Sequence, residues 1–215
     1  MLTKEQIEQN KQTFIDLIRS IERDFDKDKL INWLENSDFF YAPASTRYHS
    51  NFEGGLCAHS LSVYYSLEAL CNTFASESKY VELEDGSKKE EITCKYDKDS
   101  IIIVSLLHDI SKANFYEKYT RNIKNESTGK WESVEEYRVI DSKNRFIFGN
   151  HEETSEFMVR SFLSLKLEES VAILHHMGGS GHDSSQTDLS TIYSKYGLAA
   201  LLHSADLLST FVLNS

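Results

Sequence analysis

Two aspartates stand in stretches of sequence that are otherwise apolar, where a charged side chain needs a partner. Asp109 follows the run IIIVSLLH, and Asp206 lies inside LAALLHSADLL. Burying a carboxylate alone is costly, so each must meet a cation, strong hydrogen bonds or a proton. Few basic residues lie near either segment. A bound metal ion would satisfy both carboxylates at once.

Histidines are placed so that helices can bring them to these aspartates. His59 lies on the apolar stripe of a predicted helix, one turn from both Leu56 and Val63, so we expect it to point inward. His108 directly precedes Asp109. A lone histidine on an apolar face is more often a hydrogen-bonded core residue than a ligand. Several imidazoles beside carboxylates, however, suit Zn, Fe, Ni or Mn. A divalent transition metal is the expected cofactor.

Five blocks of the sequence resemble the corresponding blocks of bacterial and phage HD-superfamily metal-dependent phosphohydrolases. These blocks are APASTRYHSNFEGGLCAHSLSVY, LLHDISK, FGNHEETS, ILHHMGG and LLHSADLLST, and they span about residues 38–210. The chemistry-bearing residues within them follow the order H…HD…H…H…D that is typical of this family. In this chain they are His59, His108, Asp109, His151, His176 and Asp206.

The resemblance implies a centre that holds one or two metal ions and activates water. Its ligands for one ion are His59, His108, Asp109 and Asp206. His151 and His176 complete a second ion site, with Asp109 as a catalytic bridge. Such a centre hydrolyses phosphomonoesters or phosphodiesters by in-line displacement, with no covalent enzyme intermediate. The expected substrate is a small nucleotide-like molecule.

Two positions depart from the family pattern or leave the ligand set open. Relatives often carry Glu just before the first histidine, where this chain has Ala58. The number of ions is therefore left at one or two. His175 and His176 are adjacent and project roughly 100° apart on a helix. The HMGG context favours His176, and His175 is the alternative ligand.

Four further residues are candidates for contact with a phosphorylated substrate. Lys112 ends the D-x-x-K element one turn beyond His108, so its ammonium can reach a nonbridging phosphate oxygen. In the preceding loop, His49 is a candidate for protonating the leaving group and Arg47 for binding phosphate. Lys195, between two tyrosines, is a candidate for closing the pocket. A structural or solvent-exposed role is the competing interpretation for each.

The resemblance and the hydrophobic periodicity together predict an all-α HD-domain bundle with a small accessory β-hairpin or flap. One domain, residues 1–215, would contain N-terminal helices within 1–37 and the HD core over 38–214. Residues 78–98 and 115–148 alternate polar and apolar side chains, so we expect β-rich insertions there. Tyr116, Tyr119 and Trp131 in the second insertion either stack on bases or pack on the body.

The composition of the chain limits the kinds of molecule that it can bind and the setting in which it is expected. The chain has 34 Asp and Glu against 23 Lys and Arg, a formal charge of −11, so duplex nucleic acid is an unfavourable partner. Its three cysteines, an odd number without CxxC spacing, predict a reducing, cytoplasmic setting. The apolar runs are too short to span a membrane, and the amphipathic start is unlike a signal peptide.

Two other classes of function compete with the hydrolase. One is a non-catalytic HD module that binds a nucleotide or a protein partner, which the absence of Glu at position 58 favours. The other is a helical protein whose histidines and aspartates form a purely structural metal site. Structural sites are normally closed, so an open coordination position would distinguish them.

Overall fold

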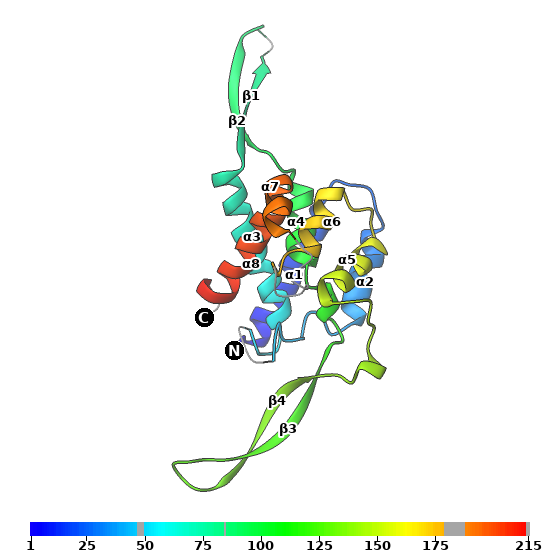
Figure 1. Ribbon diagram of the computed structural model, residues 1–215, viewed down its shortest axis with the longest axis vertical. Helices are drawn as coiled ribbons and strands as arrows, with labels where there is room; N and C mark the ends of the chain where they lie inside the picture. Colours follow the sequence, from blue (N-terminus) through cyan, green and yellow to red (C-terminus); the bar gives the residue numbers. More distant parts are fainter. Residues whose placement is uncertain (47–49, 84, 179–187, 214–215) are drawn as a thin grey trace.

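The computed structural model describes residues 1–46, 50–83, 85–178 and 188–213. Its body is built from helices, and two long hairpins project from opposite ends of that body (Figure 1). In chain order the elements are α1 (Lys4–Ser20), α2 (Lys27–Asn36), α3 (Gly55–Phe74), β1 (Ser76–Glu82), β2 (Lys88–Cys94), α4 (Lys98–Leu107), η1 (Ile110–Lys112), β3 (Tyr116–Lys124), β4 (Trp131–Val139), η2 (Ser142–Asn144), α5 (His151–Arg160), α6 (Leu167–Leu174), α7 (Leu189–Lys195), α8 (Gly197–Leu208) and the π-helical end η3 (Ser209–Leu213).

Helix α4 lies at the centre of the body because its sequence offers no polar face. Every residue from Ser100 to Leu107 is buried, and Asp97 caps the helix by accepting a hydrogen bond from the Ser100 backbone N–H. Helix α3 packs against α4 and α8, and α6 packs against both α4 and α8. The helix ends that follow α4 and α6 are thereby brought to one place inside the body.

A buried ion pair fixes the N-terminal helices to α6. Arg23, which follows α1, donates to both carboxylate oxygens of Glu169 over 2.9 and 2.6 Å. Ser100 of α4 donates to the same carboxylate at 2.6 Å. Because the Glu169 side chain is only 1% exposed, these contacts replace its hydration almost completely. The first helices, α4 and α6 are therefore held together by one charged group.

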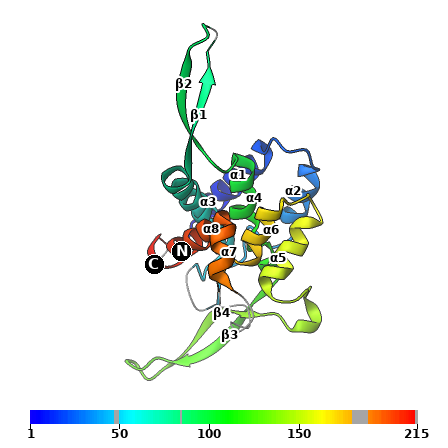
Figure 2. The same ribbon diagram turned by 45° about the horizontal axis from the view of Figure 1, so that its top comes forward.

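The expectation of an all-α bundle with one small flap is wrong. The structure has two antiparallel two-stranded sheets, β1–β2 with strands of 7 residues and β3–β4 with strands of 9 residues. Both extend beyond the helices in both ribbon views (Figure 2). Each strand pairs with its neighbour in the hairpin, and cross-strand ion pairs such as Arg138–Glu117 at 2.7 Å stabilise the ribbon. The strand content is therefore larger than the sequence led us to expect.

Apolar burial is concentrated in the helical body. The core cluster draws on α1 to α6 and on α8, with Phe14, Leu56 and Ile103 among its fully buried members. No single described helix is long and apolar enough to cross a membrane; α7 and the segment Gly197–Leu213 reach that length and composition only together, across a bend of 110°.

Candidate metal centre

Six of the residues singled out in the sequence come from separate elements and meet inside the body. His59 lies on α3, His108 and Asp109 follow α4, and Asp206 lies on α8. His151 is the first residue of α5, and His176 comes two residues after α6. Except for the partly exposed His151, all of them are buried. The segments that carry them are far apart in the sequence, so the cluster depends on the tertiary fold.

Asp109 stands between two pairs of histidines. Its Oδ2 lies 3.4 Å from Nε2 of His108 and 3.8 Å from Nε2 of His59. Its Oδ1 lies 3.6 Å from Nε2 of His176 and 3.8 Å from Nε2 of His151. Each pair forms, with Asp109, a triad whose ligand atoms all lie within 4.8 Å of one another. The carboxylate can therefore serve two adjacent cation positions, one on each oxygen.

Asp206 extends the first of these triads. Its Oδ1 lies 3.1 Å from Nε2 of His59, and the carboxylate is mostly buried. The helical register that places Asp206 on the inner face of α8 also buries Leu202 and Ala205. The structure thus brings the second buried aspartate to the same group of imidazoles as the first.

The orientation of the histidine rings fits a metal ion. Nδ1 of His108 donates to the Ser105 carbonyl, and Nδ1 of His176 donates to the Ile173 carbonyl, each over 2.8 Å. These contacts fix the rings with Nε2 turned toward Asp109. Among the described residues, Nε2 of His108, His151 and His176 and Oδ1 of Asp109 are buried without a hydrogen-bond partner. Buried polar atoms are normally satisfied, and a cation would satisfy all four.

The surroundings hold both carboxylates in the charged form. Burial alone would raise the pKa of Asp109, but the nearby Lys112 ammonium and the imidazoles of His108 and His176 outweigh it and hold the pKa well below the usual range. Burial opposes ionisation of Asp206 too, yet contact with His59 lowers its pKa. Two buried anions at neutral pH concentrate negative charge where a cation can bind.

The imidazoles differ in how readily they become neutral ligands. Burial lowers the pKa of His151 to about 4, and it also lowers the pKa of His59. Burial acts in the same direction on His176, but Asp109 outweighs it and raises the pKa. Metal binding requires neutral imidazole, so His59 and His151 are already suited to it. The raised pKa of His176 opposes metal binding at this imidazole.

The cluster confirms part of the prediction made from the sequence. His59, His108, Asp109, His151 and His176 could hold a metal ion, although the geometry does not name the metal. His175, the alternative ligand, belongs to neither triad and is instead the residue at which α6 ends.

The structure describes two of the four residues that were predicted to contact the substrate. Lys112 Nζ lies 2.7 Å from Oδ2 of Asp109, inside the centre. Lys195 is exposed at the end of α7, with its ammonium 5.3 Å from the ring centre of Tyr196. Arg47 and His49 lie outside the described residues.

Three supporting residues were not predicted in the roles they have here. His203 Nδ1 lies 2.6 Å from the carbonyl of His176. Glu152 is fully buried and accepts a hydrogen bond from the Met177 backbone at 3.2 Å, which links the start of α5 to the turn after His176. Nothing in the sequence distinguishes it from an ordinary acidic residue in the first turn of a helix.

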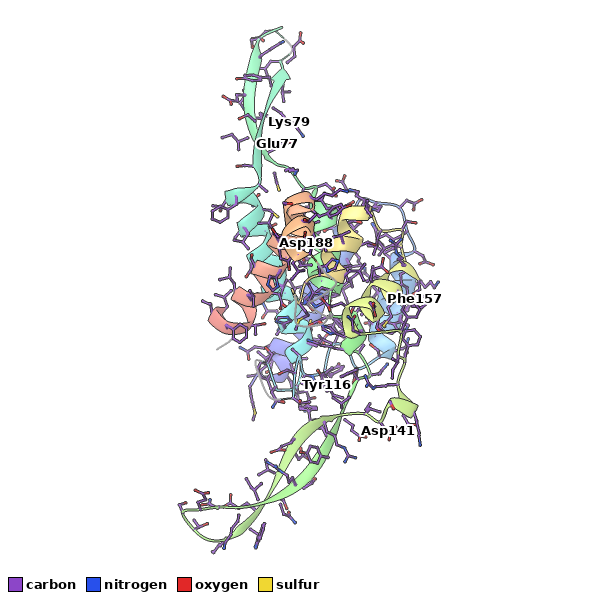
Figure 3. All side chains as sticks on the ribbon, viewed as in Figure 1. Glu77, Lys79, Tyr116, Asp141, Phe157 and Asp188 are labelled. Carbon is purple, nitrogen blue, oxygen red and sulfur yellow. The ribbon has the colours of Figure 1, made fainter. Side chains whose placement is uncertain are left out.

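The third supporting residue is Tyr116, at the start of β3. Burial raises the pKa of the Tyr116 phenol, and the positive charge of Lys112 opposes that rise. The phenol and the ammonium therefore interact electrostatically. The sequence had placed this tyrosine only in the accessory flap. Tyr116 lies where the second hairpin meets the helical body (Figure 3), so the base of this hairpin is near Lys112.

No known protein family, curated protein or solved structure matches this chain.

Proposed function

We propose that this chain is a metal-dependent phosphohydrolase of the HD type, which cleaves a phosphomonoester or phosphodiester of a nucleotide-like substrate. The position of Asp109 supports the proposal most, because its two carboxylate oxygens face different pairs of histidines. A carboxylate that bridges two cations a few ångströms apart is the arrangement that two-metal phosphoryl transfer uses. The order of the six residues in the sequence, H…HD…H…H…D, supports the assignment to the HD type.

The side chains of the centre would have two roles, metal binding and phosphate binding. When bound, one or two divalent ions (Mn, Fe, Ni or Zn) would lower the pKa of a water molecule and neutralise charge on the phosphoryl group. His59, His108, His151, His176, Asp109 and Asp206 would hold them. Lys112 would donate to a nonbridging phosphate oxygen and stabilise the charge that develops during displacement.

The charge of the chain favours a small substrate. The formal charge of −11 opposes long polyanions, whereas a metal-loaded centre is locally positive.

All three cysteines, Cys57, Cys71 and Cys94, are free thiols, which agrees with the cytoplasmic setting that we propose.

A non-catalytic module that binds a nucleotide or a protein partner is the second candidate. The observation that favours it is Ala58, in the first turn of α3 directly before His59, where relatives often carry Glu. The retention of all six ligand residues argues for the enzyme. The two functions differ in whether bound phosphate esters are turned over.

The test is to load the purified protein separately with Mn, Ni, Fe and Zn and to measure turnover of bis-p-nitrophenyl and p-nitrophenyl phosphate. The proposal expects hydrolysis that depends on the metal and is abolished in Asp109→Ala. A panel of nucleoside monophosphates, cyclic nucleotides and short oligonucleotides then identifies the substrate class. Tight nucleotide binding without hydrolysis under any of the four metals would establish the binding module instead.

A further inference from the structure

A cavity lies on the α2 and α5 side of the body. It has a volume of about 520 Å³ and is lined by residues of α2, η1, η2 and α5 and of the segments that follow η1, η2 and α5. Helices α2 and α5 lie next to each other in both ribbon views, and Phe157 marks this side of the body in Figure 3. The volume is within the range of small-molecule sites, about 300–1,000 Å³.

Five of the twelve residues that line the cavity are aromatic. They are Trp33, Phe115, Phe146, Phe157 and Phe162. The rings of Phe146 and Phe157 are stacked with 5.9 Å between centroids, yet Phe146 is 58% exposed and Phe157 is 44% exposed. Large aromatic side chains left open around a cavity offer flat faces on which another ring can stack. The shape and lining therefore suit a planar aromatic ligand.

One arginine gives the cavity a specific polar contact. The guanidinium of Arg145 lies 4.4 Å from the ring centre of Phe115, which holds its plane against the wall. Its Nε is buried and has no hydrogen-bond partner among the described residues. A guanidinium edge presents parallel N–H donors, and this geometry matches a ligand with two neighbouring acceptors. The O6 and N7 atoms of guanine are such a pair.

The local charge also favours a nucleotide. The whole chain carries a formal charge of −11, but among the described residues no aspartate or glutamate lines this cavity. Lys29 adds a second positive group at its edge, with its ammonium 5.8 Å from the ring centre of Phe162. An anionic ligand therefore meets less repulsion here than over the acidic surface as a whole.

The cavity is adjacent to the metal centre through a single residue. Ser111 lines the cavity, and its hydroxyl donates to the backbone carbonyl of His151 at 3.0 Å. The next residue, Lys112, contacts Asp109 inside the centre. We propose that this cavity binds the guanine base of a nucleotide, with the base stacked on the aromatic wall and its O6 and N7 edge on Arg145. The proposal does not rest on the phosphohydrolase function.

Intrinsic fluorescence gives a direct test, because Trp33 lines the cavity and the chain has only one other tryptophan, the exposed Trp131. In a Trp131→Phe background, GMP is titrated in the presence of EDTA with excitation at 295 nm. We expect a saturable change in Trp33 emission. AMP should bind about tenfold or more weakly, because adenine carries a donor amino group at the position of the O6 acceptor of guanine.

Two variants test the assigned contacts. Arg145→Gln should weaken GMP binding by about tenfold or more, since it removes the paired donors. Phe157→Leu should weaken it by a smaller factor, because it keeps the apolar volume and removes one ring. Arg138→Gln, in the exposed Glu117 pair of the β3–β4 hairpin, is the matched control and should bind GMP as the parent does. Circular dichroism and thermal melting check that each variant is folded.

Three results would overturn the proposal: no saturable GMP signal from the folded parent, equal affinity for GMP and AMP, or unchanged affinity in folded Arg145→Gln. Because EDTA removes any metal, failure here leaves the phosphohydrolase proposal standing. Conversely, GMP binding in EDTA would stand even if no hydrolysis were found.

Discussion

The ammonium of Lys112 lies 2.7 Å from Oδ2 of Asp109, the carboxylate oxygen that faces His59 and His108. This contact raises the pKa of Lys112 despite the burial that acts against it. A metal ion bound to the same oxygen would compete with the ammonium for its negative charge. The long, flexible lysine side chain can then turn toward a phosphate oxygen. The lysine is thus suited to act on substrate once metal is bound.

Replacement of Lys112 should separate metal binding from turnover. We expect Lys112→Ala to retain its metal and to lose roughly a hundredfold in kcat/KM, the size of effect seen when one charge-stabilising donor is removed. Metal content by mass spectrometry and hydrolysis of a phenyl phosphate ester are measured on the same sample. Lys79→Ala, in the exposed β1–β2 hairpin, controls for the loss of one surface charge. A fully active Lys112→Ala would remove the lysine from the mechanism.

The two triads predict different metal losses for different ligands. Asp109 belongs to both, so Asp109→Ala should lose all bound metal and all activity. His151 belongs to one, and His151→Ala should retain the ion held on the His59 and His108 side. Metal content per chain is the measurement. Equal metal content in the two variants would contradict the division into two cation positions.

Metal removal should also destabilise the fold, because the ligands come from α3, α5, α8 and the ends of α4 and α6. Binding at a hundred times Kd stabilises the native state by about 2.7 kcal/mol. For a chain of this size we expect Tm to fall by roughly 5–10 °C on chelation and to recover when metal returns. Differential scanning calorimetry measures the shift. An unchanged Tm after verified removal would show that the core is complete without metal.

The Arg23–Glu169 pair should make stability depend on pH. Burial acts to raise the pKa of Glu169, but hydrogen bonds from Arg23 and Ser100 lower it below its usual value. A lowered folded pKa stabilises the protein fully above the unfolded pKa, and the stabilisation is lost as pH falls through the folded value. Arg23→Gln should cost about 3 kcal/mol near pH 7 and less at pH 3. Urea unfolding measures both, and a penalty that does not shrink with acid would refute the pair's role.

The sequence was most informative where burial and charge conflict. Asp109 follows an apolar helix and Asp206 stands within another, so their need for a cation could be inferred without a structure. The helical periodicity that turned His59 inward placed it correctly. Lys112 could be predicted because it lies three residues from Asp109, and the short 3-10 turn η1 keeps the two side chains together.

The features that could not be predicted from the sequence depend on loops and on long-range packing. The size of the hairpins was underestimated, since paired strands that project from the body bury little and leave a weak pattern. The contact of His203 with the His176 carbonyl joins α8 to the turn after α6, and nothing in either segment alone predicts it. The cavity beside Arg145 likewise forms only when α2 and α5 come together with the segments after η1 and η2.

The central claim is that Asp109 holds cations between two histidine pairs. Anomalous diffraction from crystals soaked in manganese chloride tests it most directly, because it locates the ions without reference to activity. We predict peaks on both sides of the Asp109 carboxylate, one near His59 and His108 and the other near His151 and His176. A manganese-soaked crystal with no anomalous peak within reach of Asp109 would contradict the claim.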